Sequence, residues 1–326
     1  MTEVFWSYWH VAAERQAMFF RRLNGESPPW TDDAVLRHYR FTNAYRASDR
    51  VSQFLLQRVI YGGTYEAEDV VLRVLLFKIF NRVETWEWIL DAVGDVTTTT
   101  FDPDVIGDEL SHHFAAGDRL YSAAYIMPNP QLGSERKHVN HLALLDTLRV
   151  GGRLSWIASA GSLRELYARI LSIPSFGPFL AFQYAIDLNY SDLFDFSEMD
   201  YVVAGPGALR GIAKCFVDTS GLAAEGVIRS MTHDVPAFME AAGVDFSDLW
   251  GRPLQLIDCQ NLFCEVDKYA RVVHPDMGAR GPARIKQNFR PNPAPLRVGY
   301  PPKWQLPATA GEPASVRKSD GRGSGI

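Results

Sequence analysis

Apolar side chains recur along most of the chain at the three- and four-residue spacing of amphipathic helices. Few runs alternate between apolar and polar residues, and no series of strand–helix units appears. The pattern therefore predicts an all-α fold. We expect helices over residues 3–23, 34–61, 67–93, 103–126, 138–150 and 162–172, with an interruption of the second near Thr42. Residues 31–33 (Thr-Asp-Asp) are typical of a helix N-cap with acids in the first turn.

Composition narrows the class of protein. The chain has 326 residues, of which 47% are hydrophobic and 22% charged, so it can bury one large core or two modest ones. Disorder, collagen, coiled coil and a disulfide-stapled mini-protein are excluded. No apolar run approaches the length of a membrane span, and the first residues lack the pattern of a secretory signal. We therefore expect a cytoplasmic protein without a membrane partner.

The Cys and His residues of the chain do not have the spacing of metal ligands. Cys215, Cys259 and Cys264 form no CxxC pair and no four-ligand pattern, and His112 and His113 are adjacent and so face different sides of a helix. Neither structural zinc nor an iron–sulfur cluster is expected. We predict no metal, no cofactor and buried, reduced thiols.

The net charge of −5 hides an asymmetry. From Asp276 to the end, nine basic residues stand against three acidic ones, whereas the body before it carries a net charge of −11. This last segment also holds eight of the nineteen prolines. We predict a helical catalytic domain over residues 1–275, in one unit or two lobes, and an extended or disordered basic tail over 276–326. We expect the tail to aid solubility, and an arm lying across the body or a phosphate backbone is the alternative.

A helix–hairpin–helix pattern lies at residues 171–187. A helix ends, residues 173–177 (Ile-Pro-Ser-Phe-Gly) form a tight turn, and Pro178 suits the first turn of the next helix. Free backbone amides at such a turn attract phosphate, so Ser175 and Gly177 are candidates for a backbone grip on DNA. The arrangement resembles DNA glycosylases, whose essential Asp follows the hairpin, and Asp195 and Asp200 occupy that range here. An ordinary joint between two helices would show the same pattern.

A second glycine-rich entry into a helix follows at residues 205–214. Gly205 and Gly207 leave backbone amides bare, and Arg210 with Lys214 adds positive charge, so this segment is a candidate phosphate site. The pattern GxxxxGK[ST] is absent, which excludes a nucleotide-binding P-loop of that type.

Two further groups of polar residues, within 41–50 and 258–268, lie among apolar residues. If residues 41–50 are helical, Asn43, Arg46 and Arg50 line one stripe beside Asp49, among aromatic residues that include Tyr45. On the helix expected near the C-terminal end of the body, one stripe is polar and consists of Asp258, Asn261, Glu265 and Lys268. Solvated faces with local ion pairs are the alternative interpretation of both.

Four motifs in the same order carry a resemblance to a known family. They are residues 29–33 (Pro-Trp-Thr-Asp-Asp), 39–50 (Tyr-Arg-Phe-Thr-Asn-Ala-Tyr-Arg-Ala-Ser-Asp-Arg), 203–212 (Val-Ala-Gly-Pro-Gly-Ala-Leu-Arg-Gly-Ile) and 264–269 (Cys-Glu-Val-Asp-Lys-Tyr). The body from residue 5 to 274 resembles the alpha-glutamyl/putrescinyl thymine pyrophosphorylases, also described as the helical domain of 5-hydroxymethyl-deoxyuridine DNA kinases. The resemblance implies a fold similar to helix–hairpin–helix DNA glycosylases. The family also includes an antiphage glycosylase that removes glucosylated hydroxymethylcytosine.

The resemblance implies two competing activities on double-stranded DNA with modified bases. We expect a DNA glycosylase that flips out a hypermodified base of phage DNA, excises it and leaves an abasic site in antiviral defence. Asp200 would be its catalytic carboxylate, and the other candidates are Asp49, Asp195 and Asp218. No lysine occurs between Lys137 and Lys214, so an amine nucleophile near the hairpin is missing and the enzyme should be monofunctional.

In the alternative, a transferase attaches an amino acid or polyamine to 5-pyrophosphomethyl-deoxyuridine in DNA and releases pyrophosphate. Its leaving group would be neutralised by four residues, Arg46, Arg50, Arg210 and Lys214. In the glycosylase that we expect, Asn43, Tyr45, Arg46 and Asp49 would shape the base pocket, and Arg50 and Arg210 would contact phosphate or sugar. A supporting network would consist of Asp258, Asn261, Glu265 and Lys268. A non-enzymatic binder of modified DNA is the third option. No obligate protein partner is inferred.

Overall fold

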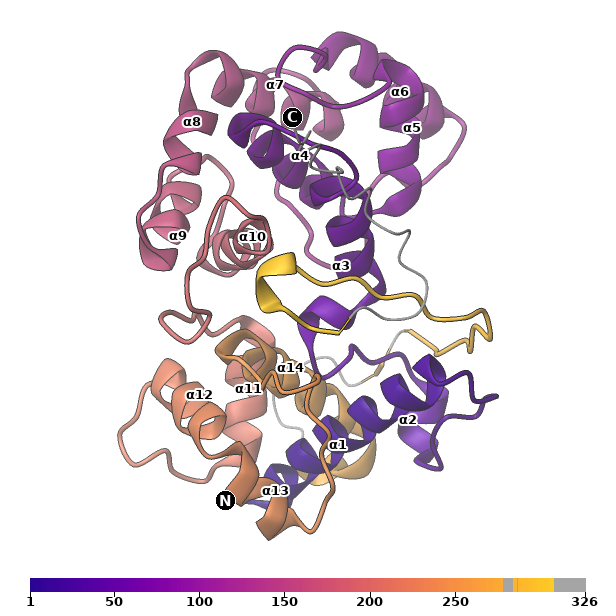
Figure 1. Ribbon diagram of the computed structural model, residues 1–326, viewed down its shortest axis with the longest axis vertical. Helices are drawn as coiled ribbons and strands as arrows, with labels where there is room; N and C mark the ends of the chain where they lie inside the picture. The colour runs from indigo at the N-terminus through magenta and orange to yellow at the C-terminus, as the bar shows by residue number, and fades with distance from the viewer. Residues whose placement is uncertain (278–283, 286, 308–326) are drawn as a thin grey trace, which may run out of the picture.

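The computed structural model describes residues 1–277, 284–285 and 287–307, and this part of the chain is all-helical. Only two isolated β-bridges occur in it, Tyr39 with Asn288 and Leu249 with Arg252. The all-α prediction is therefore confirmed. Figure 1 shows two halves stacked along the long axis, with the segment around α3 (Arg50–Phe54) between them. The two ends of the helical body build one half, and the middle of the chain builds the other.

The first half is organised around α14 (Leu256–Val273), which packs against α1, α11 and α12. The predicted first helix is confirmed as α1 (Glu3–Leu23), with Thr2 as its N-cap. The remaining elements of this half are α2 (Ala34–His38), α11 (Pro206–Cys215), α12 (Ala224–His233), α13 (Val235–Ala242) and η3 (Pro275–Met277). Tyr8, Trp9 and Phe263 fill the interior between α1 and α14.

The second half surrounds α4 (Ala67–Phe80), whose residues from Val70 to Phe80 are all buried. A helix that is buried on every face belongs in the centre of a bundle, and α4 packs against α7, α8 and α10. The other helices here are α5 (Val83–Val93), α6 (Pro103–Ala115), α7 (Lys137–Val150), α8 (Arg153–Ala158), α9 (Leu163–Leu171) and α10 (Pro178–Asn189).

Two predicted helices are shorter than the periodicity suggests. The helix expected over 67–93 breaks at Asn81, which adopts the left-handed conformation (φ 50°) and accepts a hydrogen bond from Lys78 Nζ at 2.9 Å. The helix expected over 103–126 ends at Ala115, followed by Gly117 with φ 88°. Local backbone reversals therefore set these helix ends, although the apolar pattern continues past them.

The helix expected over 34–61 is interrupted near Thr42, as predicted, but the interruption is longer than expected and spans residues 39–45. Asp33 caps α2 as the sequence predicts, but the chain then runs irregularly to η1 (Arg46–Ser48), α3 and the π-helical turn η2 (Leu55–Ile60). The backbone amides of Thr42 and Arg46 donate to Glu265 and Asp258 of α14, at 3.0 and 2.8 Å. In a helix these two amides would donate to carbonyls of the preceding turn, but here they donate to side-chain carboxylates. The tertiary contact with α14 therefore overrides the helical preference of this segment.

Residues 287–307 contain one short helical turn, η4 (Pro302–Trp304), and otherwise lack regular structure. They nonetheless lie on the body, with Val298 buried and Tyr300 and Trp304 packed against the core. An arm across the body thus describes this part of the tail. The rest of the predicted tail, residues 278–283, 286 and 308–326, lies outside the described residues, and the proposed domain boundary stays a prediction.

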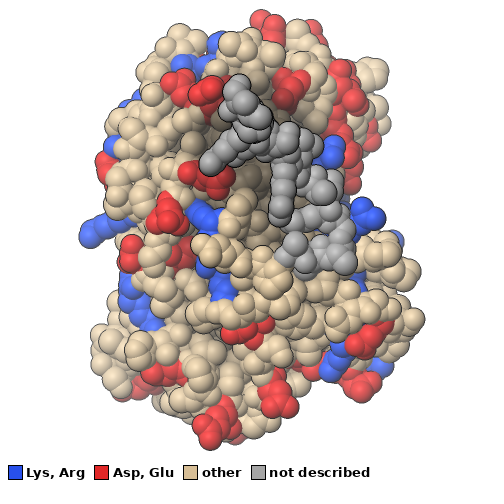
Figure 2. All heavy atoms as spheres, viewed as in Figure 1, with Lys and Arg blue, Asp and Glu red and all other residues tan. Residues whose placement is uncertain are grey.

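Charge is unevenly distributed over the surface. Figure 2 shows acidic side chains gathered along the edge formed by α5 and α6, where five exposed acids are Glu84, Glu87, Asp91, Asp104 and Asp108. This face repels a polyanion. Among the helices described, none is long and apolar enough to cross a membrane.

Candidate active site at the junction of the two halves

A buried ion pair lies at the junction. Arg46 Nη1 and Nη2 lie 2.5 and 3.0 Å from the two carboxylate oxygens of Asp187 on α10, and Lys78 Nζ of α4 lies 3.2 Å from one of them. Arg46 and Asp187 are 2% and 0% exposed, so the cluster holds two cations and one anion away from water. Burial opposes ionisation of Asp187, but Arg46 and Lys78 outweigh it and hold the pKa of this carboxyl below its ordinary value.

The same arginine connects the two halves. Its Nε donates to Gln183 Oε1 at 3.0 Å, and the amide of Gln183 donates to Gln260 Oε1 at 3.3 Å. Because Gln183 belongs to α10 and Gln260 to α14, a polar seam crosses from one half to the other. Asp258 adds a second function, since it also accepts from the backbone amide of Gln255 and caps α14.

Residues 43–49 form a closed loop beside this seam. The backbone amide of Asn43 donates to Asp49 Oδ1 at 2.8 Å, and its side-chain amide donates to the carbonyl of Ser48 at 2.7 Å. From α1, Arg15 donates to Asn43 Oδ1 at 2.7 Å and to the carbonyl of Thr42 at 2.8 Å. The loop is therefore fixed both by its own bonds and by a helix of the first half.

Asp49 is the one carboxyl of this loop. Its pKa is raised to about 7. Burial is the largest cause and nearby Glu265 acts in the same direction, while the amide of Asn43 and the charges of Arg15 and Arg46 act against them. A carboxyl with a pKa near neutrality can accept and release a proton at the pH of a cell. Glu265 is itself held by Lys268 Nζ at 2.6 Å.

Aromatic rings close the site from the side of the second half. Tyr125 has a left-handed backbone (φ 55°), stacks on Phe179 with ring centroids 5.9 Å apart, and covers Lys78 at 4.8 Å. Burial raises the pKa of Tyr125 to about 12, so its hydroxyl stays protonated. A side chain at Gly205 would lie 2.5 Å from Phe179, which explains why glycine opens α11 here.

A second charged cluster lies where α11 packs on α14. Lys214, Arg271 and Arg210 lie 2.9, 2.6 and 3.1 Å from the carboxylate of Asp267. Three cations share one anion, so the cluster keeps an excess of positive charge, and the side chain of Arg210 is 33% exposed. This patch can attract an anion.

The structure brings together about half of the residues that the sequence singles out. Around the seam lie Asn43, Arg46, Asp49, Gly205, Asp258, Glu265 and Lys268. Gly207 contacts the same region, because a side chain there would lie 2.8 Å from Cys264 Sγ. Asn261 is buried on α14, while the hydroxyl of Tyr45 binds the carbonyl of Arg252 and serves the packing of the core. The helical stripe expected through Asn43, Arg46 and Arg50 is wrong, because residues 41–45 are not helical.

Other candidates are exposed or lie in the turn before α10. Asp200 is exposed, and in the part of the chain described its carboxylate forms no ion pair or hydrogen bond, while its backbone carbonyl accepts from Arg229 at 2.7 Å. Arg50 is exposed as well. Ser175 adopts a left-handed backbone (φ 72°) in the turn before α10, and Gly177 is its N-cap with open space around it.

Sequence reasoning missed the residues on α4 and α10. Lys78, Gln183 and Asp187 stand alone inside long apolar runs, and an isolated charge or amide in a buried helix usually has a partner. That signal identifies them as buried polar residues, but it does not name Arg46 as the partner. Within the described residues, no group of three or more His, Cys, Asp or Glu side chains is arranged to hold a metal ion.

Comparison with known proteins identifies one relative that is named a 5-hmdU DNA kinase, from Bacillus phage SP10. It is 27% identical over 292 residues, which are 82% of this chain and 45% of the relative. The chain thus spans less than half the length of that relative. No solved structure is significantly similar to the chain.

These comparisons also correct the predicted reaction. A DNA kinase is a transferase that acts on modified DNA, so the prediction of a hydrolytic DNA glycosylase is contradicted. The role given to Asp200 depended on that hydrolysis. The family described as "5-hmdU DNA kinase, helical domain" matches residues 2–279, which is most of the helical body. The chain belongs to this family.

Proposed function

We propose that the chain is a transferase that acts on DNA whose thymine bases carry a modified 5-methyl group. In the reaction that we favour, an amino acid or polyamine replaces the pyrophosphate of 5-pyrophosphomethyl-deoxyuridine. Membership of the family and the name of the phage relative support modified thymine as the base concerned. The observation that carries the proposal is Asp49, a partly buried carboxyl with a pKa of about 7 between two arginines.

The reaction needs one proton acceptor. The nitrogen lone pair of the amine attacks the methylene carbon attached to C5, and a carbon–nitrogen bond forms. The carbon–oxygen bond to pyrophosphate breaks, and its electron pair leaves with the pyrophosphate. The nitrogen then loses a proton to Asp49, which releases it to water. Base catalysis of this kind works best when the pKa of the acceptor is close to the working pH.

The leaving group carries several negative charges. Arg210 and Lys214 lie in the cluster with surplus positive charge on α11 and α14, and we assign them to the pyrophosphate. Arg46 is already paired with Asp187, so its proposed task is to hold the loop of residues 43–49 and to set the potential around Asp49. The contact of Arg50 with phosphate or sugar stays a prediction.

The base and the backbone of the DNA need separate contacts. The rings of Tyr125 and Phe179 lie next to the Arg46 cluster and offer flat apolar surface for an extruded pyrimidine. The turn at Ser175 and Gly177 precedes α10, whose free N-terminal amides suit a phosphate. We propose that the two contacts act on the same double-stranded DNA.

The test uses a DNA duplex that contains 5-pyrophosphomethyl-deoxyuridine, together with a set of amino acids and polyamines. We expect pyrophosphate release that depends on an amine, and nucleosides whose mass has increased by the amine. The Asp49→Asn variant should be slower by a factor of about 10² or more, because the proton acceptor is lost. Asp91→Asn, on the acidic face of α5, is the matched control. Pyrophosphate release without incorporation of amine would contradict the proposal, as would duplex that stays unchanged with every amine.

The same assay decides the assignment of Asp200. Because Asp200 is exposed and unpaired within the described structure, we expect Asp200→Asn to retain activity. A loss as large as that of Asp49→Asn would return the catalytic role to Asp200.

A further inference from the structure

The chain carries a segment beyond the family domain that reaches the candidate site. The family match ends at residue 279, whereas residues 298–304, here called the strap, lie against the junction of the two halves. In Figure 1 the strap is the yellow segment in front of α3 and below α10. Its contacts are too specific for a tail that only adds solubility.

One end of the strap binds the segment between the halves, residues 46–54, here called the connector. Gln53 of α3 accepts from the backbone amide of Gly299 at 2.8 Å and donates to its carbonyl at 3.1 Å. The side-chain amide thus pairs with both polar groups of one residue, as a neighbouring strand would. The Tyr300 hydroxyl lies 2.8 Å from Ser48 Oγ, and Ser48 is 2% exposed.

The other end of the strap contacts both halves, through Lys303 and Trp304. Lys303 Nζ donates to three backbone carbonyls, that of Asn189 at the C-terminal end of α10 and those of Ser191 and Phe194 in the segment after it. A cation there also faces the negative end of the helix dipole. Trp304 stacks on Arg252, whose guanidinium lies 3.7 Å from the ring centroid, at the start of the segment that leads into α14.

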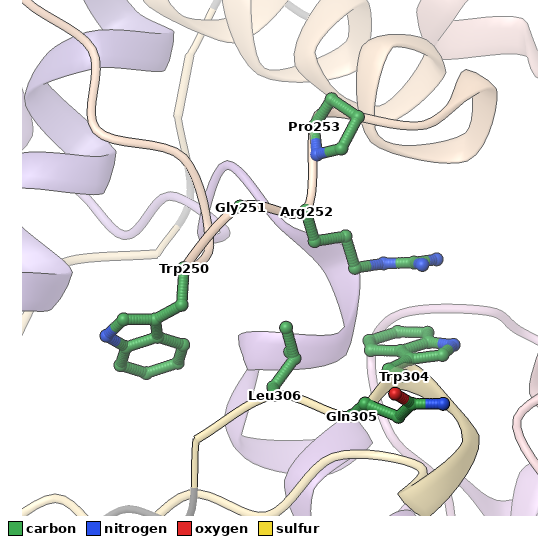
Figure 3. Close-up of a pocket in the computed structure, with 7 residues that line it drawn as sticks. All are labelled: Trp250, Gly251, Arg252, Pro253, Trp304, Gln305 and Leu306. Atoms are coloured by element: carbon green, nitrogen blue, oxygen red, sulfur yellow. The ribbon is translucent and has the colours of Figure 1, made fainter.

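Figure 3 shows how the strap meets this segment. The Arg252 side chain extends above the indole of Trp304, and Trp250 lies across a hollow of about 310 Å³ with Leu306 between the two indoles. Arg252 is fixed from its other side by Glu198 at 2.7 Å. The strap therefore has one partner in each half and one in the connector.

We propose that Tyr300 is a positioning residue for the loop of residues 43–49, and that the strap holds this loop closed around Asp49. The connection is direct. Tyr300 holds the side chain of Ser48, the carbonyl of Ser48 accepts from Asn43 Nδ2, and the amide of Asn43 donates to Asp49. Arg15 fixes the loop from α1, and Tyr300 fixes it from the strap. The use of Asp49 as proton acceptor rests on the proposed function, whereas the positioning of the loop does not.

The consequence can be measured on Asp49. The charged or titratable groups that act on it are Arg15 of α1, Arg46 of η1, Lys78 of α4, Glu265 of α14 and Tyr125. None of these belongs to the strap. Loosening the loop would admit water, reduce the burial that raises the pKa of Asp49 and move that pKa toward its ordinary value.

The test needs no substrate. Carboxyl carbon NMR of protein labelled at aspartate follows the titration of Asp49, whose signal is assigned by its loss in Asp49→Asn. We expect the midpoint to fall by about half a pH unit or more in Tyr300→Phe and in Lys303→Met. Amide exchange of residues 43–49 should become faster in both. Tyr167→Phe, on α9, is the control for loss of a tyrosine hydroxyl.

Truncation gives an independent comparison. A chain that ends after residue 297 lacks the strap, and a chain that ends after residue 307 keeps it. We expect the first to show the lowered midpoint and the faster exchange, and the second to match the full chain. Unchanged titration and exchange in both point variants and in the shorter chain would overturn the proposal. Failure of the transferase assay alone would leave it standing, because neither measurement depends on turnover.

Discussion

Arg46 and Asp187 form a two-pronged ion pair, with N–O distances of 2.5 and 3.0 Å, in which neither side chain is more than 2% exposed. The pair connects the loop that precedes α3 to the C-terminal half of α10. Lys78 adds a second cation, so Asp187 balances two positive charges in the interior. Loss of this carboxylate would therefore leave both cations buried without their anion.

Removal of that carboxylate should be costly. In Asp187→Ala, Arg46 and Lys78 stay buried without an anion, and we expect a loss of about 3–5 kcal/mol in the free energy of unfolding. Asp146→Ala removes an ion pair with Arg149 in which both side chains are about one-third exposed, and it should cost less than about 1 kcal/mol. Urea denaturation of the two variants measures the difference. Equal losses in the free energy of unfolding would show that the buried ion pair stabilises the fold no more than the exposed one.

The pH dependence of stability should follow from three carboxyls. Burial raises the pKa of Asp49 and Glu198 to about 7 and that of Asp258 to about 6. Each group binds its proton more tightly in the folded chain, so the folded state holds more protons than the unfolded state between about pH 4 and 7. Stability should therefore decrease as pH rises through this window, with a slope of up to about 1.4 kcal/mol per pH unit for each group.

Asp49→Asn isolates one contribution. The variant cannot ionise at this position, so its stability relative to the native chain should improve between pH 5 and 7.5. Urea midpoints at several pH values measure the change. A constant difference between the two chains across that range would contradict the raised pKa of Asp49.

Much of the fold could be predicted from the sequence, because helical periodicity is a local property. The bounds of α1 and α7, the cap at Asp33 and the start of α10 at Pro178 follow from side chains within a few residues. The segment after α2 could not be predicted in this way. Its amides are satisfied by Asp258 and Glu265, which lie more than 200 positions later in the chain.

In the candidate site too, local features could be predicted from the sequence and long-range contacts could not. Asn43, Arg46 and Asp49 could be selected as a polar group among aromatic residues, and the structure does bring them together. The sequence does not reveal that Arg46 pairs with Asp187, because nothing local connects the two. The reaction could not be derived from residue types at all, since a buried acid beside arginines suits both hydrolysis and transfer.

Gly211 of α11 and Gly177, the N-cap of α10, give a contrast in packing. A methyl group at Gly211 would lie 2.0 Å from the carbonyl oxygen of Phe263, and backbone atoms of α14 cannot move aside easily. At Gly177 no atom lies within 4 Å of the added carbon, and its φ of −85° suits any residue. We expect Gly211→Ala to destabilise by about 1–3 kcal/mol as an overpacked core does, and Gly177→Ala to change stability by less than about 1 kcal/mol. Thermal unfolding of the two variants measures the difference. A larger loss of stability in Gly177→Ala than in Gly211→Ala would contradict this prediction.

The basic cluster on α11 should contribute to DNA affinity through charge. Arg210 is the partly exposed member of the group around Asp267, whereas Lys214 is 7% exposed, so we expect the larger effect on binding from Arg210. In Arg210→Gln a contact with the pyrophosphate would be lost, so binding of a duplex that carries 5-pyrophosphomethyl-deoxyuridine should weaken. The slope of log affinity against log salt should become shallower by about 1, because one fewer counterion is released. Fluorescence anisotropy at several salt concentrations measures both quantities.

Arg149→Gln, on α7, is the matched control, since its guanidinium is already paired with Asp146 at 2.6 Å. It removes the same charge from the chain as a whole, so a general effect of net charge would appear in both variants. A phosphate contact would appear in Arg210→Gln alone. If the two variants keep the same salt slope, Arg210 does not reach the DNA, and the assignment of this cluster to the pyrophosphate loses its electrostatic support.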